Sequence, residues 1–152
     1  MNTAEGWLKA LLRLFGGVSA LAIFAVVMPW WWMGWVHDWL GMGVLPEAPI
    51  VEYLARSTSG LCALYGGLLL VLATDVRRYA PVIRFQAVVM MLLTTIGAVL
   101  GLRAGMPAWW MICDAASVWL FCGVTLVAER RVGHLDATFG GTPAPATFRR
   151  MR

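Results

Sequence analysis

The sequence predicts an all-α membrane protein: a bundle of four transmembrane helices, with a tryptophan-rich interfacial helix in the first outer connection. Two observations predict this fold. The 152 residues are 61% hydrophobic and only 13% charged, whereas a soluble domain of this size usually carries about twice that share of charge. The apolar residues also gather in four stretches, and each reaches the roughly 20 residues with which a helix crosses about 30 Å of hydrocarbon.

Helices are expected because lipid offers no partner to an unpaired peptide group, and the stretches lack the short alternating pattern of barrel strands. No small-x-small cleavage pattern follows Val27, so the first stretch is interpreted as an uncleaved helix and not as a signal peptide. Residues 1–132 are expected to form one membrane domain. Its spans are expected at about residues 8–29, 50–74, 81–103 and 107–129.

The segment after the first span, MPWWWMGWVHDWLGMG, is interpreted as a helix lying in the interface plane. Helical spacing places Trp32, Trp35 and Trp39 on one stripe and His37 and Asp38 on the other. Tryptophan suits this layer because its ring is apolar and its indole N–H needs a wet partner. A ligand-binding aromatic box and plain core packing are the alternatives. The expected interface belt consists of Trp30, Trp31, Trp32, Trp35, Trp39, Trp109 and Trp110.

Prolines mark the connections between the later spans. Pro46 and Pro49 turn the chain before the second span, and Pro81 is expected as an early residue of the third helix. The sequence RAGMP predicts a tight turn before the fourth span. Residues 133–152 mix Gly, Pro, Thr and Ala without apolar periodicity and are expected to form a mostly disordered cytoplasmic tail.

Basic residues predict the orientation in the membrane. They lie before the first span, between the second and third spans, and after the fourth, whereas the connections at 29–55 and 104–107 carry no Lys or Arg. This asymmetry places both termini in the cytoplasm of a bacterial-type inner membrane. The net charge of +4 is therefore interpreted as orientation and contact with anionic lipid heads. Nucleic acid is not an expected partner, because the basic residues are split among three segments.

Small residues at four-residue spacing predict where helices pack closely. Such spacing lets backbones approach in a membrane, where no hydrophobic effect drives helix association. The same faces could serve a homo-oligomer or a membrane protein partner. The packing residues are expected to be Ser59, Ala63 and Gly67 on the second span, and Gly97, Gly101 and Gly105 on the third.

Asp114 is the charged residue that most needs a partner, because it lies about 6 to 7 Å inside the Trp109 and Trp110 pair. Arg56 shares its stripe with the small face of the second helix, so an ion pair between Arg56 and Asp114 is predicted. Glu52 is a rival partner, since it precedes Arg56 by four residues in the favourable order. A cluster of Glu52, Arg56 and Asp114, with His37 and Asp38 over it, would be a structural clamp, a pocket for a small amphipathic molecule, or a proton-transfer site.

Conventional catalysis, a metal site and a bound cofactor are not expected. His37 and His134 both lie outside the spans, which excludes a haem held by facing histidines, and no His, Cys and carboxylate set has metal-ligand spacing. The cysteines Cys62, Cys113 and Cys122 are interpreted as small buried apolar residues. Gln86 is expected to mark the inner interface.

The segments YLARSTSGLCALYGGLLLVLATDVRRYAPVIRF and AGMPAWWMICDAASVWLF, within residues 50–128, resemble the DoxX-like group and its four-helix inner-membrane relatives. The resemblance rests on an Arg before a small-residue helix, a D-x-R-R-Y motif and an acid early in the fourth helix. It implies a compact four-helix bundle and, for some members, a role as a membrane subunit beside redox enzymes. A non-catalytic accessory or scaffolding role is therefore the first expectation, and binding or carrying a lipid head group, quinone or small solute is the second.

Overall fold

The computed structural model describes residues 3–139, with side chains as far as residue 132, and this part of the chain is all α-helical. Its helices are α1 (Thr3–Ala20), α2 (Ile23–Val27), α3 (Trp30–Trp39), α4 (Pro49–Leu72), α5 (Ala80–Arg103) and α6 (Ala108–Phe139). Four segments are long and apolar enough to cross a membrane: Thr3–Val27, Pro49–Leu72, Ala80–Arg103 and Ala108–Val132. The chain is a multi-span integral membrane protein, and the predicted fold class is confirmed.

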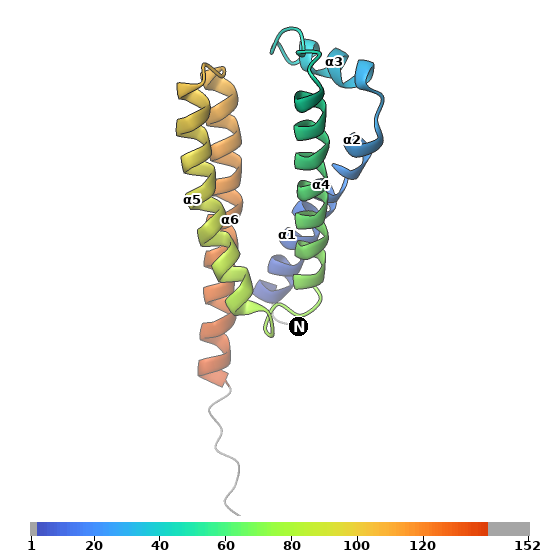
Figure 1. Ribbon diagram of the computed structural model, residues 1–152. Coiled ribbons are helices and arrows are strands. Elements are labelled where there is room, and N and C mark those ends of the chain that lie inside the picture. The colour runs from blue at the N-terminus through green and yellow to red at the C-terminus, as the bar shows by residue number, and fades with distance from the viewer. Residues whose placement is uncertain (1–2, 140–152) are drawn as a thin grey trace, which may run out of the picture.

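The four spans are arranged as two helical pairs, seen side by side in Figure 1. The first span, formed by α1 and α2, packs along α4, and α5 packs along α6. The two pairs meet where α1 contacts α6, near the start of α1 and the connection between α4 and α5. We call this the N-terminal end of the bundle. The opposite end, where the pairs diverge, carries α3 and the turn between α5 and α6, and we call it the α3 end.

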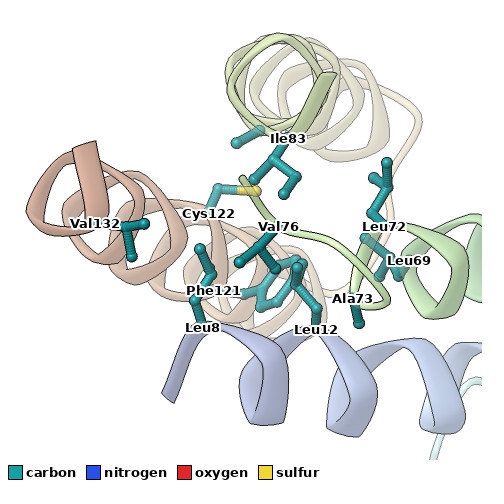
Figure 2. Packing of buried hydrophobic residues seen from close by; sticks show 11 residues of the cluster. Leu8, Leu12, Leu69, Leu72, Ala73, Val76, Ile83, Phe121, Cys122 and Val132 are labelled. Atoms are coloured by element: carbon teal, nitrogen blue, oxygen red, sulfur yellow. The ribbon is translucent and has the colours of Figure 1, made fainter. Parts of the chain in front are cut away.

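The buried core lies at the N-terminal end and joins the two pairs (Figure 2). Phe15 of α1 stacks on Phe121 of α6, with ring centroids 4.1 Å apart. Ala73 and Val76, in the connection between α4 and α5, are also buried here. The core consists of Leu8, Leu12, Leu69, Leu72, Ala73, Val76, Ile83, Ala87, Phe121, Cys122 and Val132.

Away from this core, the helices of the chain cover little of one another. Within an apolar 18-residue window of each candidate span, between 11% and 17% of the residues are buried inside the molecule. Large apolar side chains such as Leu61, Leu64 and Leu120 are exposed on the sides of the bundle. In a bilayer these surfaces face lipid or another protein, because the chain itself does not cover them.

The spans begin and end close to the predicted residues, with two differences. The first span bends between α1 and α2, where backbone hydrogen bonds at residues 21–25 reach three residues back, as in Ala22 N–H to the Ser19 carbonyl. At the other end of the chain, α6 runs to Phe139, so the part of the expected tail at 133–139 is helical. A single glycine, Gly133, weakens a helix without ending it. The rest of that tail lies outside the described residues.

The closest approach of two helices is made by glycines, one from α1 and one from α4. A Cβ atom added at Gly66 would lie 2.6 Å from the carbonyl oxygen of Gly16 and would also collide with the backbone nitrogen of Ala20. Only hydrogen fits between these backbones. The close crossing therefore depends on Gly16 and Gly66 themselves.

The glycines singled out in the sequence have other surroundings. A Cβ added at Gly67 or Gly97 would meet no heavy atom within 4 Å, so these residues do not make close helix contacts within the described chain. Gly67 is one residue from Gly66, and one residue turns a helix by about 100°. Gly101 does lie against Met111 of α6, whereas Gly105 has a φ of 86° and ends α5 in the left-handed conformation. Ser59 and Ala63 are half-buried.

We predict that Gly66→Ala destabilises the protein by about 1–3 kcal/mol, because the added methyl group is forced against backbone atoms that cannot rotate away. The measurement is thermal unfolding of the purified chain in detergent, followed by circular dichroism. Gly67→Ala is the matched control, since it adds the same methyl group in open space and improves helix propensity. Equal unfolding temperatures for the two variants would contradict the crossing.

Candidate functional site

The structure brings Glu52 and Arg56 together near the start of α4. The Nε and Nη2 atoms of Arg56 donate hydrogen bonds of 2.9 and 2.8 Å to the same carboxylate oxygen of Glu52. The remaining Nη1 group donates to the backbone carbonyl of Val26, in the last turn of α2. Carbonyls at the end of a helix have no partner within it, so Arg56 satisfies one of them. The arginine therefore fastens the second part of the first span to α4.

The predicted ion pair between Arg56 and Asp114 is not formed. Arg56 belongs to the α1–α4 pair and is held by α2, whereas Asp114 lies on α6, which packs against α5 and α1. The two pairs diverge toward the α3 end (Figure 1). Asp114 is exposed, and no ion pair with its carboxylate is found within residues 3–132. The small face of α4 does place Arg56 toward a neighbouring helix, but that helix is α2.

His37 and Asp38 both lie on α3, and within the described residues neither forms a hydrogen bond with Glu52 or Arg56. The Nδ1 atom of His37 is 2.8 Å from the carbonyl oxygen of Gly43, so this side chain holds the loop after α3. Asp38 is exposed and lines a cavity of about 340 Å³ together with Trp30, Trp31, Trp35 and Glu47. These residues form a second site with charged groups, distinct from the predicted cluster of Glu52, Arg56 and Asp114.

An apolar cavity lies beneath α3, and it was not predicted from the sequence. Its volume is about 260 Å³, and α3 encloses it with residues from α2 and α4. Methionine and aliphatic side chains make up most of its wall, and methionine adapts its shape to different ligands. The lining residues are Ala25, Met28, Met33, Val36, His37, Leu40, Met42, Leu45 and Ala55. Because they come from four segments, no spacing within one helix could have revealed them.

A third cavity, of about 230 Å³, surrounds Asp114 at the start of α6. Its other lining residues are Trp109, Trp110, Cys113 and Ser117. The two indole rings meet edge to face, with centroids 5.6 Å apart. The Ser117 hydroxyl donates to the carbonyl of Asp114 at 2.8 Å or to that of Cys113 at 2.9 Å, so it is occupied by its own helix.

The tryptophans of the expected interface belt gather at one end of the molecule. Trp30, Trp31, Trp32, Trp35 and Trp39 lie on α3, and Trp109 and Trp110 follow the turn between α5 and α6. Both places belong to the α3 end (Figure 1). Most of these rings are exposed, including Trp31, Trp35 and Trp39. Their position at a membrane surface stays a prediction.

Charged and polar contacts at the N-terminal end were not anticipated from the sequence. Glu5 forms ion pairs with Lys9 at 2.7 Å and with Arg77 at 3.0 Å, which joins α1 to the connection between α4 and α5. Arg84 of α5 pairs with Glu129 of α6 at 2.6 Å, and Glu129 is only 5% exposed. The pairs Glu5–Arg77 and Arg84–Glu129 cross between elements, so sequence spacing could not predict them, whereas Glu5 and Lys9 stand four residues apart within α1.

Gln86, expected to mark the interface, is buried, and so is Thr125 of α6. The side-chain nitrogen and oxygen of Gln86 and the hydroxyl of Thr125 have no hydrogen-bond partner among the described residues. Of the cysteines, Cys122 is buried as expected, whereas Cys62 and Cys113 are exposed. Both lie on faces that the chain leaves uncovered.

The cavities and the uncovered helix faces are suited to binding and to helix packing. Within the described part of the chain, no three His, Cys, Asp or Glu side chains are placed to hold a metal ion. The three cavities each combine apolar or aromatic walls with few polar groups, as ligand pockets commonly do. Comparisons with protein-family models, with curated proteins and with solved structures find no match, so no family match supports the DoxX-like resemblance.

We predict that Arg56→Ala loosens α2 from α4, because it removes the contacts to Glu52 and to the Val26 carbonyl at once. Hydrogen bonds to charged groups contribute roughly 1.5–3 kcal/mol, so backbone amides at residues 23–27 should exchange with deuterium about tenfold faster or more. Exchange is measured by mass spectrometry on the purified chain. Arg103→Ala, an exposed arginine at the same end, is the control and should leave these amides unchanged. Similar exchange in both variants would show that Arg56 does not hold α2.

Proposed function

We propose that this chain is a non-catalytic accessory or scaffolding subunit of a membrane assembly, and that it works by packing its helices against a protein partner or a second copy. The observation that carries this proposal is the small share, 11% to 17%, of an apolar 18-residue window in each span that the chain buries by itself. A four-helix protein of this shape has long helix surfaces to offer to a neighbour. The DoxX-like resemblance implies a subunit role of the same kind.

Uncovered leucines alone do not favour association, because lipid tails are as apolar as leucine. Open small-residue faces do favour it, since they allow another backbone to come close. Gly67 on α4 and Gly97 on α5 have open space where a side chain would stand. Gly67 and Gly97, which were expected to pack within the bundle, are therefore available to a partner helix.

The charge distribution supports an inner-membrane location with both ends in the cytoplasm. Lys9, Arg77, Arg78 and Arg84 lie at the N-terminal end of the bundle, and Arg130 and Arg131 are exposed on α6 between the buried residues Glu129 and Val132 at the same end. The α3 end carries most of the tryptophans. Positive charge concentrated at one end is the pattern of a cytoplasmic surface, and the anionic lipid heads there would be the chain's lipid partners.

The subunit role is tested by photo-crosslinking in native membranes, with a benzophenone amino acid placed at Leu64 or at Leu69. Leu64 is 71% exposed on α4 and Leu69 is 1% exposed on the same helix. We expect the Leu64 probe to give one stoichiometric protein adduct, identified by mass spectrometry as a second copy or a partner. The Leu69 probe should react only within the chain. Lipid adducts alone from Leu64, with a monomeric chain in native lipid particles, would contradict the proposal.

A second candidate function is binding of a small amphipathic molecule, and the apolar cavity beneath α3 favours it. The cavity has the volume and lining of a modest ligand site, and the amphipathic α3 would give access from the interface. A quinone ring or another small apolar body fits this chemistry better than a charged solute does.

We predict that Ala55→Leu, which fills part of the apolar cavity, removes any molecule that copurifies with the chain. Bound small molecules are identified by mass spectrometry after gentle purification in native lipid particles. Ala116→Leu, which adds the same atoms to an exposed position on α6, is the control. A molecule retained equally by both variants would place its site elsewhere, and no retained molecule in the unsubstituted chain would argue against the binding function.

A further inference from the structure

The cavity around Asp114 combines a carboxylate with two indole rings inside a membrane span. Trp109, Trp110 and Asp114 line the same space of about 230 Å³. Asp114 lies four and five residues beyond the two tryptophans, which corresponds to about 6 to 7 Å along the helix axis. The carboxylate is therefore set below the rings, on the side of the bundle's middle.

The charge of Asp114 has no counter-ion among the described residues. Arg56 is held by Glu52 and Val26. No ion pair within residues 3–132 joins Asp114 to Arg103, the other arginine at the α3 end. An unpaired carboxylate inside a membrane span is costly, and such residues usually face a partner or a ligand. A cation from outside the described residues would supply the counter-charge that Asp114 lacks among them.

The neighbouring groups restrict what kind of cation this is. A divalent metal ion needs several oxygen ligands, and the cavity offers one carboxylate. Indole faces attract alkylammonium groups, and aromatic walls beside a negative charge are the usual way in which proteins recognise them. A phosphate or carboxylate ligand would be repelled by Asp114. The cavity fits an organic cation with an apolar body.

We propose that Trp109, Trp110 and Asp114 form a binding site for an organic cation of the alkylammonium class, with the ammonium group between the indole rings and the carboxylate. The site lies at the α3 end, beside the turn between α5 and α6, and so at the same end of the bundle as the tryptophan-rich α3. It is separate from the cavity beneath α3 and does not depend on the proposed subunit role. Its ligand is either a free amphipathic amine or the amine head group of a lipid.

The test uses the full chain in dodecyl maltoside micelles, which contain no amine, and decyltrimethylammonium as the probe, with equilibrium dialysis against empty micelles as the blank. We expect saturable binding of one probe per chain, and a loss of affinity of about tenfold or more in Asp114→Asn, since the counter-ion is removed. Asp114→Glu should retain binding, and Trp110→Leu should weaken it severalfold. Asp75→Asn, which removes an exposed acid from the connection between α4 and α5 at the opposite end of the bundle, is the matched control and should bind as the unsubstituted chain does.

Three results would overturn the site: no saturable binding, equal affinity in Asp114→Asn, or competition by neutral decyl glucoside as strong as that by the unlabelled cation. Circular dichroism of each variant verifies that it is folded, and Asp114→Glu keeps the test decisive if Asp114→Asn does not fold. Nanodiscs distinguish the two sources of the ligand. In each kind of disc, the binding specific to the site is the probe binding of the unsubstituted chain minus that of Asp114→Asn. If this specific affinity is lower in phosphatidylethanolamine discs than in phosphatidylglycerol discs, the lipid amine competes for the site and is its occupant. Equal affinity in the two kinds of disc identifies a free cation as the ligand.

Discussion

The close contact between the α1 and α4 backbones at Gly16 and Gly66 is the interaction on which the arrangement of the first pair depends. Inside a bilayer, apolar side chains gain little by leaving lipid, so helices are held together by close packing and polar contacts. Two facing glycines bring the helices near enough for dispersion contacts along their length. The same contact orients the next side chain, Phe15, which stacks on Phe121 and attaches α6.

The two ends of the molecule then differ in how they are held. At the N-terminal end, an apolar core is reinforced by ion pairs that cross between elements, such as Glu5 with Arg77 and Arg84 with Glu129. At the α3 end, Arg56 joins α2 to α4, but no hydrogen bond or ion pair among the described residues joins the two helical pairs there. Cavities with aromatic walls occur at this less tightly packed end. Binding surfaces and packing surfaces are thus separated along the bundle.

The sequence predicts where the spans lie along the chain better than it predicts which helices and side chains pack against one another. Apolar length, Pro49 and Pro81 mark the start of α4 and α5 correctly, because these signals act within one helix. The pair of Glu52 with Arg56 was likewise foreseen as a rival, since its four-residue spacing is local. The prediction that Arg56 pairs with Asp114 of α6 was wrong, because Arg56 contacts α2 instead. Helical phase shows which face of a helix packs, but it does not show which helix packs against that face. The prediction chose Gly67 as the packing glycine of α4, whereas the close contact is made by Gly66. The two residues point in directions about 100° apart around the helix. The cavity beneath α3 could not be predicted, because its wall is assembled from separate segments.

The junction between α1 and α6 also constrains how the chain assembles. α5 and α6 are consecutive helices joined by a short turn, so they can pair as soon as both have entered the membrane. α1 is synthesised long before α6, so the ring of Phe15 has no partner until α6 has entered the membrane. Contacts between segments distant in the chain close slowly, since the intervening loop must first be ordered. During that interval the exposed ring of Phe15 is the surface on which a membrane insertase or a neighbouring helix would act.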